Sequence, residues 1–250
     1  MDPHEFQLGP VKCSTHTIAQ LLDELGMLLR DKSVEGRTIL CVNAHIFNLA
    51  WSDVALREAL NSARIVTADG MGILLASRLV GVRVSKRCNM TEAFRAFLQT
   101  DDMPASQAVL LGLTADEAGA AARTMEQMST HCRITRVISG YLEEAEYRRI
   151  FESLGDVDLI LIGMGTPRTE RICEIARDTC PRAIVWGIGG GTIKIFAGTM
   201  KEAPIFWRRY GLQWLHRLCS DPLGLWPRYL IGIPLFFCRI LKSAHYARRG

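Results

Sequence analysis

Six short apolar runs, each followed by a turn and a segment of helical periodicity, constrain the fold of this chain most strongly. They are residues 38–42, 65–68, 108–112, 133–139, 159–163 and 183–187. Short apolar or β-branched runs of this kind are typical of buried strands, and their alternation with helices indicates a parallel sheet. We therefore predict an α/β, Rossmann-like fold, in which a parallel sheet carries helices on both faces.

Apolar residues spaced three and four apart predict the intervening helices. These helices are expected over residues 15–29, 46–60, 72–79, 92–98, 115–128, 145–154 and 168–180. Thr114 precedes one of them and is a suitable N-cap, because its hydroxyl can accept from the first free backbone N–H groups.

The composition changes near residue 200. From Lys201 onward, tryptophans and arginines alternate among four prolines, and the segment holds nine Lys or Arg but two acidic residues. We predict an α/β catalytic domain over residues 1–200 and a basic, aromatic-rich helical appendage over residues 201–250, with one helix at 210–219. A basic segment on a slightly acidic body indicates an anionic partner: phosphates, nucleic acid or an acidic membrane surface.

Targeting and metal-binding signals are weak in this sequence. No secretion signal opens the chain, and the apolar run 229–241 is interrupted by Pro234 and Arg239, so we expect no membrane-spanning helix. The eight cysteines form no C-x-x-C pair and show no zinc spacing, which favours reduced thiols in a cytosolic protein.

Glycine and polar residues follow three of the predicted strands, at 69–70, 163–166 and 189–192. The carboxyl ends of parallel strands share one edge of the sheet, where α/β proteins bind ligands. We predict a ligand cleft there. Asp69 either contributes to that cleft or bonds to the backbone of a tight turn. The spacing of Asp156 and Asp158 suits a metal, but both precede their strand and are expected in a solvated turn at the opposite edge.

Several motifs, in this order and spacing, resemble the WecG/TagA/CpsF family of bacterial glycosyltransferases. They are Asp69-Gly70-Met71-Gly72, Leu111-Gly112, Gly163-Met164-Gly165-Thr166-Pro167 followed by Glu170, Ala197-Gly198-Thr199, Ala203-Pro204, and Gly211-Leu212-Gln213-Trp214 with Arg217, Pro222, Arg228 and Tyr229. The two common phosphate-binding glycine motifs are absent, which argues against a dinucleotide site.

The resemblance implies an inverting, metal-independent transferase without a cofactor. Such an enzyme moves a sugar from a UDP-sugar to an undecaprenyl-diphosphate-linked sugar during exopolysaccharide assembly. It would be cytoplasmic and peripheral on the anionic inner face of the cell membrane, and homo-oligomers are expected. The resemblance implies Asp69 as the catalytic base.

The resemblance also implies a set of substrate-binding residues. These candidates are Cys41, Asn43, Arg87, Gly112, Gly163, Gly165, Thr166, Thr169, Glu170, Gly190, Lys194, Arg208, Arg209, Arg217 and Arg228. Backbone N–H groups at 163–167 and the appendage arginines would offset the charge of the departing UDP. Simpler interpretations remain: each arginine is a solvated charge, Asn43 caps a helix, and Glu170 favours a helix N-terminus.

Some positions depart from the family pattern. Cys41 stands where many members have Thr, Thr169 where Gln is usual, and Lys194 where Asp is usual, and residues 90–92 replace a Gly-Thr-Asp. These departures favour a neutral hexose donor such as UDP-glucose. The alternatives are an N-acetylmannosaminyl- or N-acetylmannosaminuronyltransferase of the same family, or a non-catalytic UDP-sugar-binding protein. A nucleic-acid partner is not expected, since no recognition motif accompanies the basic segment.

Overall fold

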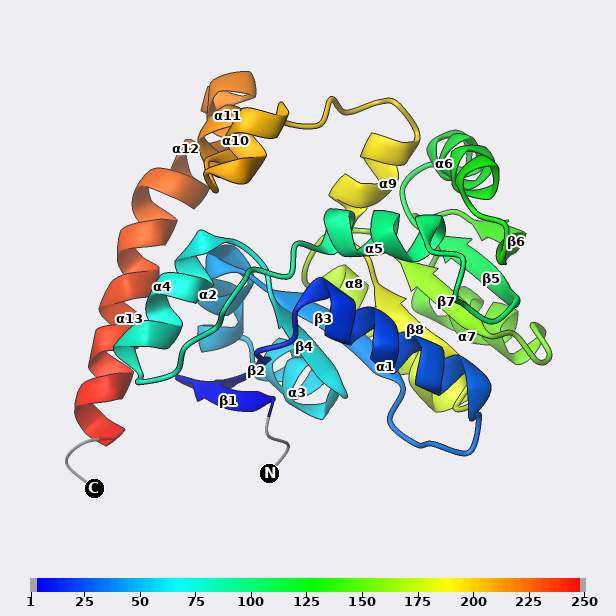
Figure 1. The fold of residues 1–250 in the computed structure, drawn as a ribbon, viewed down its shortest axis with the longest axis horizontal. Helices are drawn as coiled ribbons and strands as arrows, with labels where there is room; N and C mark the ends of the chain where they lie inside the picture. Colours follow the sequence, from blue (N-terminus) through cyan, green and yellow to red (C-terminus); the bar gives the residue numbers. More distant parts are fainter. Residues whose placement is uncertain (1–3, 248–250) are drawn as a thin grey trace.

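An eight-stranded sheet forms the centre of the molecule (Figure 1). The computed structural model describes residues 4–247, and the strand order is β1-β2-β4-β3-β8-β7-β5-β6. Only β1 and β2 pair antiparallel; the other neighbouring strands in the described part of the chain are parallel. The predicted α/β fold is confirmed.

The predicted strands are present, with ends that shift by at most about two residues. The strands are β1 Glu5–Leu8, β2 Val11–Ser14, β3 Thr38–Val42, β4 Ile65–Ala68, β5 Ser106–Leu111, β6 Cys132–Ile138, β7 Leu159–Ile162 and β8 Ile184–Gly187. The hairpin of β1 and β2 was not predicted. It turns at Gly9, whose φ of +56° suits glycine.

The helices that cover the sheet are α1 Ile18–Arg30, α2 Ala44–Ser52, α3 Val54–Ser62, α4 Met71–Leu79, α5 Met90–Gln99, α6 Ala115–Met128, α7 Glu144–Glu152, α8 Arg168–Thr179 and α9 Gly190–Phe196. Thr114 caps α6 as predicted. The prediction of one helix over 46–60 was wrong, because Asp53 ends α2 and its carboxylate accepts from the N–H of Leu56 (3.0 Å) at the start of α3.

Two apolar cores lie on opposite faces of the sheet. Leu40 and Val42 of β3 belong to the core under α2, α3, α4, α7 and α8. Ile39, which points to the other face, belongs to the core under α1, α5, α6 and α9. This alternation along one strand places helices on both faces.

The appendage is helical, as predicted, and its described part ends at residue 247; Arg248 and Arg249 of the predicted basic segment lie outside the described residues. It contains α10 Ile205–Arg209, α11 Gln213–Ser220, α12 Pro222–Trp226, the π-helical turn η1 Pro227–Ile231, and α13 Gly232–Ala247. Gly211, with φ +70°, separates α10 from α11, so the helix predicted at 210–219 begins later.

The 23 residues Pro222–Ala244 belong to one continuous helix, and their most apolar 18-residue segment has a mean hydropathy of 1.2. By length and composition alone it could reach across a membrane, although the sequence had not suggested an apolar stretch this long. In this structure it runs along the body (Figure 1), with Phe236 and Ile240 buried in the core. The Phe236 ring meets Phe47 of α2 edge-on, at 5.0 Å between ring centroids.

Candidate active site

A cleft of about 410 Å³ opens at the carboxyl ends of β3, β4 and β8. The helices that follow the neighbouring strands β3 and β8, α2 and α9, cover opposite faces of the sheet, and α/β proteins bind ligands at such a point. Sites for small molecules commonly measure about 300–1,000 Å³. The appendage supplies part of the wall, through Gly211, Gln213, Trp214, Arg217, Arg228, Tyr229 and Ile233.

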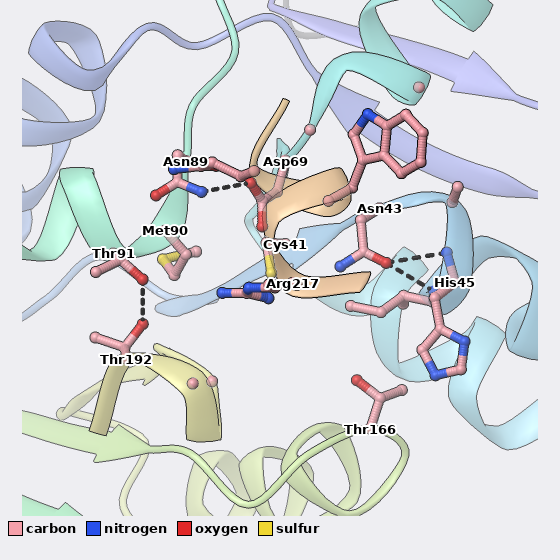
Figure 2. Close-up of a pocket in the computed structure, with 18 of the residues that line it drawn as sticks. Cys41, Asn43, His45, Asp69, Asn89, Met90, Thr91, Thr166, Thr192 and Arg217 are labelled. Atoms are coloured by element: carbon pink, nitrogen blue, oxygen red, sulfur yellow. Dashed lines mark hydrogen bonds between the residues drawn. The ribbon is translucent and has the colours of Figure 1, made fainter. Parts of the chain in front are cut away.

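Most candidate residues from the sequence meet in this cleft, and Figure 2 shows several of them. Those that line it are Cys41, Asn43, Asp69, Arg87, Gly165, Thr166, Thr169, Glu170, Gly190, Arg217 and Arg228. The predicted convergence of strand ends and appendage therefore agrees with the geometry.

Five other candidates do not line the cleft. A Cβ on Gly163 would lie 2.7 Å from the backbone of Gly189, and a Cβ on Gly112 would meet the carbonyl of Gly163, so these glycines allow adjacent strand ends to approach. Lys194 and Arg209 are exposed outside the cleft lining, and Arg208 pairs with Glu202 (3.0 Å).

Asp69 follows β4 and lies half-buried at the cleft wall. Its carboxylate accepts a hydrogen bond from Nδ2 of Asn89 at 3.0 Å (Figure 2). Burial raises the pKa of Asp69, and the Asn89 hydrogen bond and the charges of Arg217 and Arg87 partly offset that rise. A carboxylate with a raised pKa in a cleft has the properties of a general base.

Arg87 connects the body to the appendage. Its guanidinium donates to Oε1 of Gln213 (2.6 Å), to Oε1 of Glu92 (2.9 Å) and to the carbonyl of Arg208 (3.0 Å). Arg87 is therefore not a solvated surface charge: it lines the cleft and also holds α10 and α11 against its rim.

Asn43 caps α2, with Oδ1 accepting from the N–H groups of His45 (3.0 Å) and Ile46 (3.1 Å). The sequence pattern did not single out His45, which also lines the cleft. Burial, together with the charge of Arg228, lowers the pKa of His45 to about 4, so this imidazole is neutral at pH 7.

Several more residues line the cleft that were not named as binding candidates, although all but Asn89 stand in the motifs or turns quoted from the sequence: Asn89, Met90, Thr91, Thr192, Gln213, Trp214 and Tyr229. The hydroxyls of Thr91 and Thr192 are hydrogen-bonded at 2.9 Å (Figure 2). Asn89 carries the only local signal, since Oδ1 caps α5 by accepting from the N–H of Glu92 (3.1 Å).

Within residues 4–247, no group of three or more His, Cys, Asp or Glu side chains is placed to hold a metal ion. Asp156 and Asp158 precede β7, away from the cleft, and both pair with Lys32 (3.1 and 2.8 Å). All eight cysteines are free thiols.

Comparison with known proteins gives this cleft a family. The model of the WecG/TagA/CpsF glycosyl transferase family matches residues 6–250. The chain belongs to this family. The resemblance expected from the motifs is thus confirmed.

Two curated relatives come from Staphylococcus aureus, strains MW2 and NCTC 8325 / PS 47. Each is 27% identical over 239 residues, which cover 94% of this chain and 91% of the relative. Both are described as N-acetylglucosaminyldiphosphoundecaprenol N-acetyl-beta-D-mannosaminyltransferase. These descriptions favour the N-acetylmannosaminyl alternative over the glucose prediction, which they do not support.

Proposed function

We propose that this family member transfers an N-acetylmannosaminyl group from a UDP-sugar to N-acetylglucosamine on a diphosphate-linked undecaprenol. The observation that carries the proposal is the position of Asp69, a carboxylate of raised pKa at the carboxyl end of β4, in the wall of the cleft. The acceptor and the transferred sugar are those named for the relatives.

In the proposed reaction, a carboxylate oxygen of Asp69 takes the proton from the acceptor hydroxyl. The hydroxyl oxygen forms a bond to the anomeric carbon, while the bond from that carbon to the diphosphate oxygen breaks. UDP leaves with the electron pair. Attack on the face opposite the leaving group inverts the configuration. A base of raised pKa supports proton removal near neutral pH.

Arg217 and Arg228 are the side chains that would offset the charge of the departing diphosphate. Both come from the appendage and line the cleft. Nε of Arg228 is buried and has no hydrogen-bond partner among the described residues, and burial lowers the pKa of this arginine. Guanidinium groups match phosphate oxygens with paired donors, so a diphosphate here would satisfy them.

A lipid-linked acceptor requires access from a membrane surface. The appendage exposes apolar side chains, including Leu223 (88% exposed) and Leu230 (59%), and also carries Arg209 and Lys242. Apolar and basic side chains together suit the headgroup region of an anionic bilayer. We propose peripheral association with the inner face of the cell membrane, and homo-oligomer formation stays a prediction.

A panel of donors tests the proposed function. The full chain is incubated with a short-chain lipid-diphosphate N-acetylglucosamine and, separately, UDP-N-acetylmannosamine, UDP-N-acetylmannosaminuronic acid, UDP-glucose or UDP-N-acetylglucosamine. We expect UDP release and disaccharide product with UDP-N-acetylmannosamine. Preferred use of UDP-glucose would contradict this proposal and support the donor predicted from the sequence. Donor binding without any product would favour the non-catalytic alternative.

A further inference from the structure

Glu170 is a buried carboxylate on the cleft wall with one oxygen left unsatisfied. It lies in the first turn of α8 and is 4% exposed. Its Oε1 accepts from the hydroxyl of Thr166 at 2.8 Å. Its Oε2 is buried and has no hydrogen-bond partner among residues 4–247. An unsatisfied buried acceptor is costly, so its retention on a cleft wall points to a donor from a ligand.

The electrostatic surroundings of Glu170 differ from those of Asp69. Burial raises the pKa of Glu170, and only hydrogen bonds from Thr166 and from the backbone offset that rise. Arg217 and Arg87, by contrast, lower the pKa of Asp69. The cleft thus has a cationic part beside Asp69 and a part beside Glu170 where no arginine charge is felt.

Cys41 of β3, Asp69 and Glu170 line the same cleft. A single extended ligand that fills this cleft would therefore meet both carboxylates.

The N-terminus of α8 would by itself attract a phosphate. Here the carboxylate of Glu170 already lies in that first turn, and a second anion beside it would be repelled. This repulsion favours placing the diphosphate near the arginines and not at residues 163–167. The part of the ligand beside Glu170 should therefore be uncharged and should carry a hydrogen-bond donor for Oε2.

We propose that Oε2 of Glu170 accepts a hydrogen bond from a hydroxyl or N–H in the uncharged part of the nucleotide sugar, and so helps to select the donor substrate. The Thr166 hydroxyl fixes Oε1 and thereby orients Oε2. This inference rests on the proposed function, because it takes a nucleotide sugar as the ligand. The hydrogen atom belongs to the base, the ribose or the transferred sugar.

Calorimetric titration of the full chain with UMP, UDP, UDP-N-acetylmannosamine and inorganic pyrophosphate tests the proposal. Glu170→Gln presents an amide donor where an acceptor is needed, so we expect at least about tenfold weaker binding of the ligand that carries the donor group. If affinity falls equally for UMP, UDP and the UDP-sugar, the hydrogen-bond donor belongs to the nucleoside. A loss confined to the UDP-sugar assigns it to the transferred sugar. Pyrophosphate affinity should not change.

Glu174→Gln is the matched control, since this carboxylate lies one turn later on α8, outside the cleft lining, beside Arg177 (3.9 Å). A purely structural role for Glu170 would lower the melting temperature of Glu170→Gln. We expect that temperature to stay equal or rise, because a buried charge becomes a neutral amide. If Glu170→Gln does not fold, Glu170→Asp replaces it in the titrations. This variant keeps the charge but draws the carboxylate oxygens away from the ligand, so we expect a similar loss of affinity.

The proposal is overturned if Glu170→Gln binds every ligand as Glu174→Gln does, if pyrophosphate binding weakens equally, or if neither Glu170 variant folds. Failure of the proposed function looks different. In that case the unaltered chain binds none of the nucleotide ligands, and the inference falls with it. An unaltered chain that binds and transfers, alongside an equally competent Glu170→Gln, removes only the inference.

Discussion

Asp69 and Asn89 form the pair of side chains that sets the acid–base behaviour of the cleft. The Asn89 amide donates to the ionised carboxylate and so lowers the pKa of Asp69, whereas burial raises it. A general base works in its ionised form, so transfer should rise with pH through the pKa of Asp69 and level off above it. His45, whose pKa is about 4, is neutral near pH 7 and does not change its charge there.

Replacing Asn89 with Asp removes the donor and adds a negative charge beside Asp69. Both changes raise the pKa of Asp69, so the acidic limb of kcat/KM should move to higher pH by about one unit or more. An aspartate still caps α5, but each unit by which the native pKa of Asp69 rises costs about 1.4 kcal/mol above that pKa, so the melting temperature at neutral pH should fall. A pH–rate profile of the variant that matches the unaltered protein, or shifts to lower pH, would show that Asp69 is not the titrating group.

The sequence alone could indicate Asp69 but not Asn89, His45 or Trp214. Asp69 follows a recognisable buried strand and precedes two glycines, so its place at the sheet edge is dictated locally. Trp214 reaches the cleft only because the appendage folds back over the body. Such placement depends on tertiary packing, which spacing within the sequence does not report.

At the scale of elements, the junction between the loop before α5 and the helices α10 and α11 shapes the rim of the cleft. Arg87 spans this junction, and Glu202 bridges Arg95 and Arg208 beside it at 3.0 Å each. Because these contacts are half-buried and form a network, they should stabilise the junction more than an isolated surface ion pair would.

Arg87→Lys should loosen this junction, because one ammonium group cannot reproduce the forked contacts to Gln213, Glu92 and the Arg208 carbonyl. We expect amide hydrogen exchange over residues 205–220 to speed up about tenfold, with the strands unaffected. Arg83→Lys, at an exposed arginine in the same loop, is the control. Unchanged exchange in Arg87→Lys would mean that other contacts hold the appendage.

Three elements were misjudged from the sequence, each for its own local reason. The hairpin strands β1 and β2 mix polar and apolar residues, and so lack the continuous apolar or β-branched run that marks the equally short β4, β7 and β8. Asp53 interrupts a helical pattern whose apolar spacing continues across it. Pro234 was expected to interrupt the apolar run 229–241, yet it lies inside α13, which directly follows the π-helical turn η1.

At the scale of the whole molecule, the appendage has two contrasting faces. Phe236 and Ile240 pack into the core, whereas Leu223 and Leu230 face solvent. The body therefore relies on the appendage for part of its core, and removal of residues 201–250 would expose buried surface. Substitutions on the outer face probe membrane association without that cost.

Leu223→Glu combined with Leu230→Glu should weaken flotation with anionic vesicles by about tenfold, because two apolar contacts are lost and two negative charges added. Val54→Glu, an exposed apolar residue on α3, is the control and should float as the unaltered chain does. Equal flotation of all three proteins would count against membrane association through this face.

The rate of sugar transfer by Asp69→Asn, measured with UDP-N-acetylmannosamine and the lipid-linked acceptor, tests the central claim most directly. The amide keeps the shape of the side chain but cannot take the acceptor proton, so kcat should fall by about 10²–10⁴-fold. Donor affinity and melting temperature should stay those of Asp101→Asn, an exposed aspartate in a loop. Transfer by Asp69→Asn at a rate close to that of the unaltered protein would contradict the assignment of Asp69 as the base.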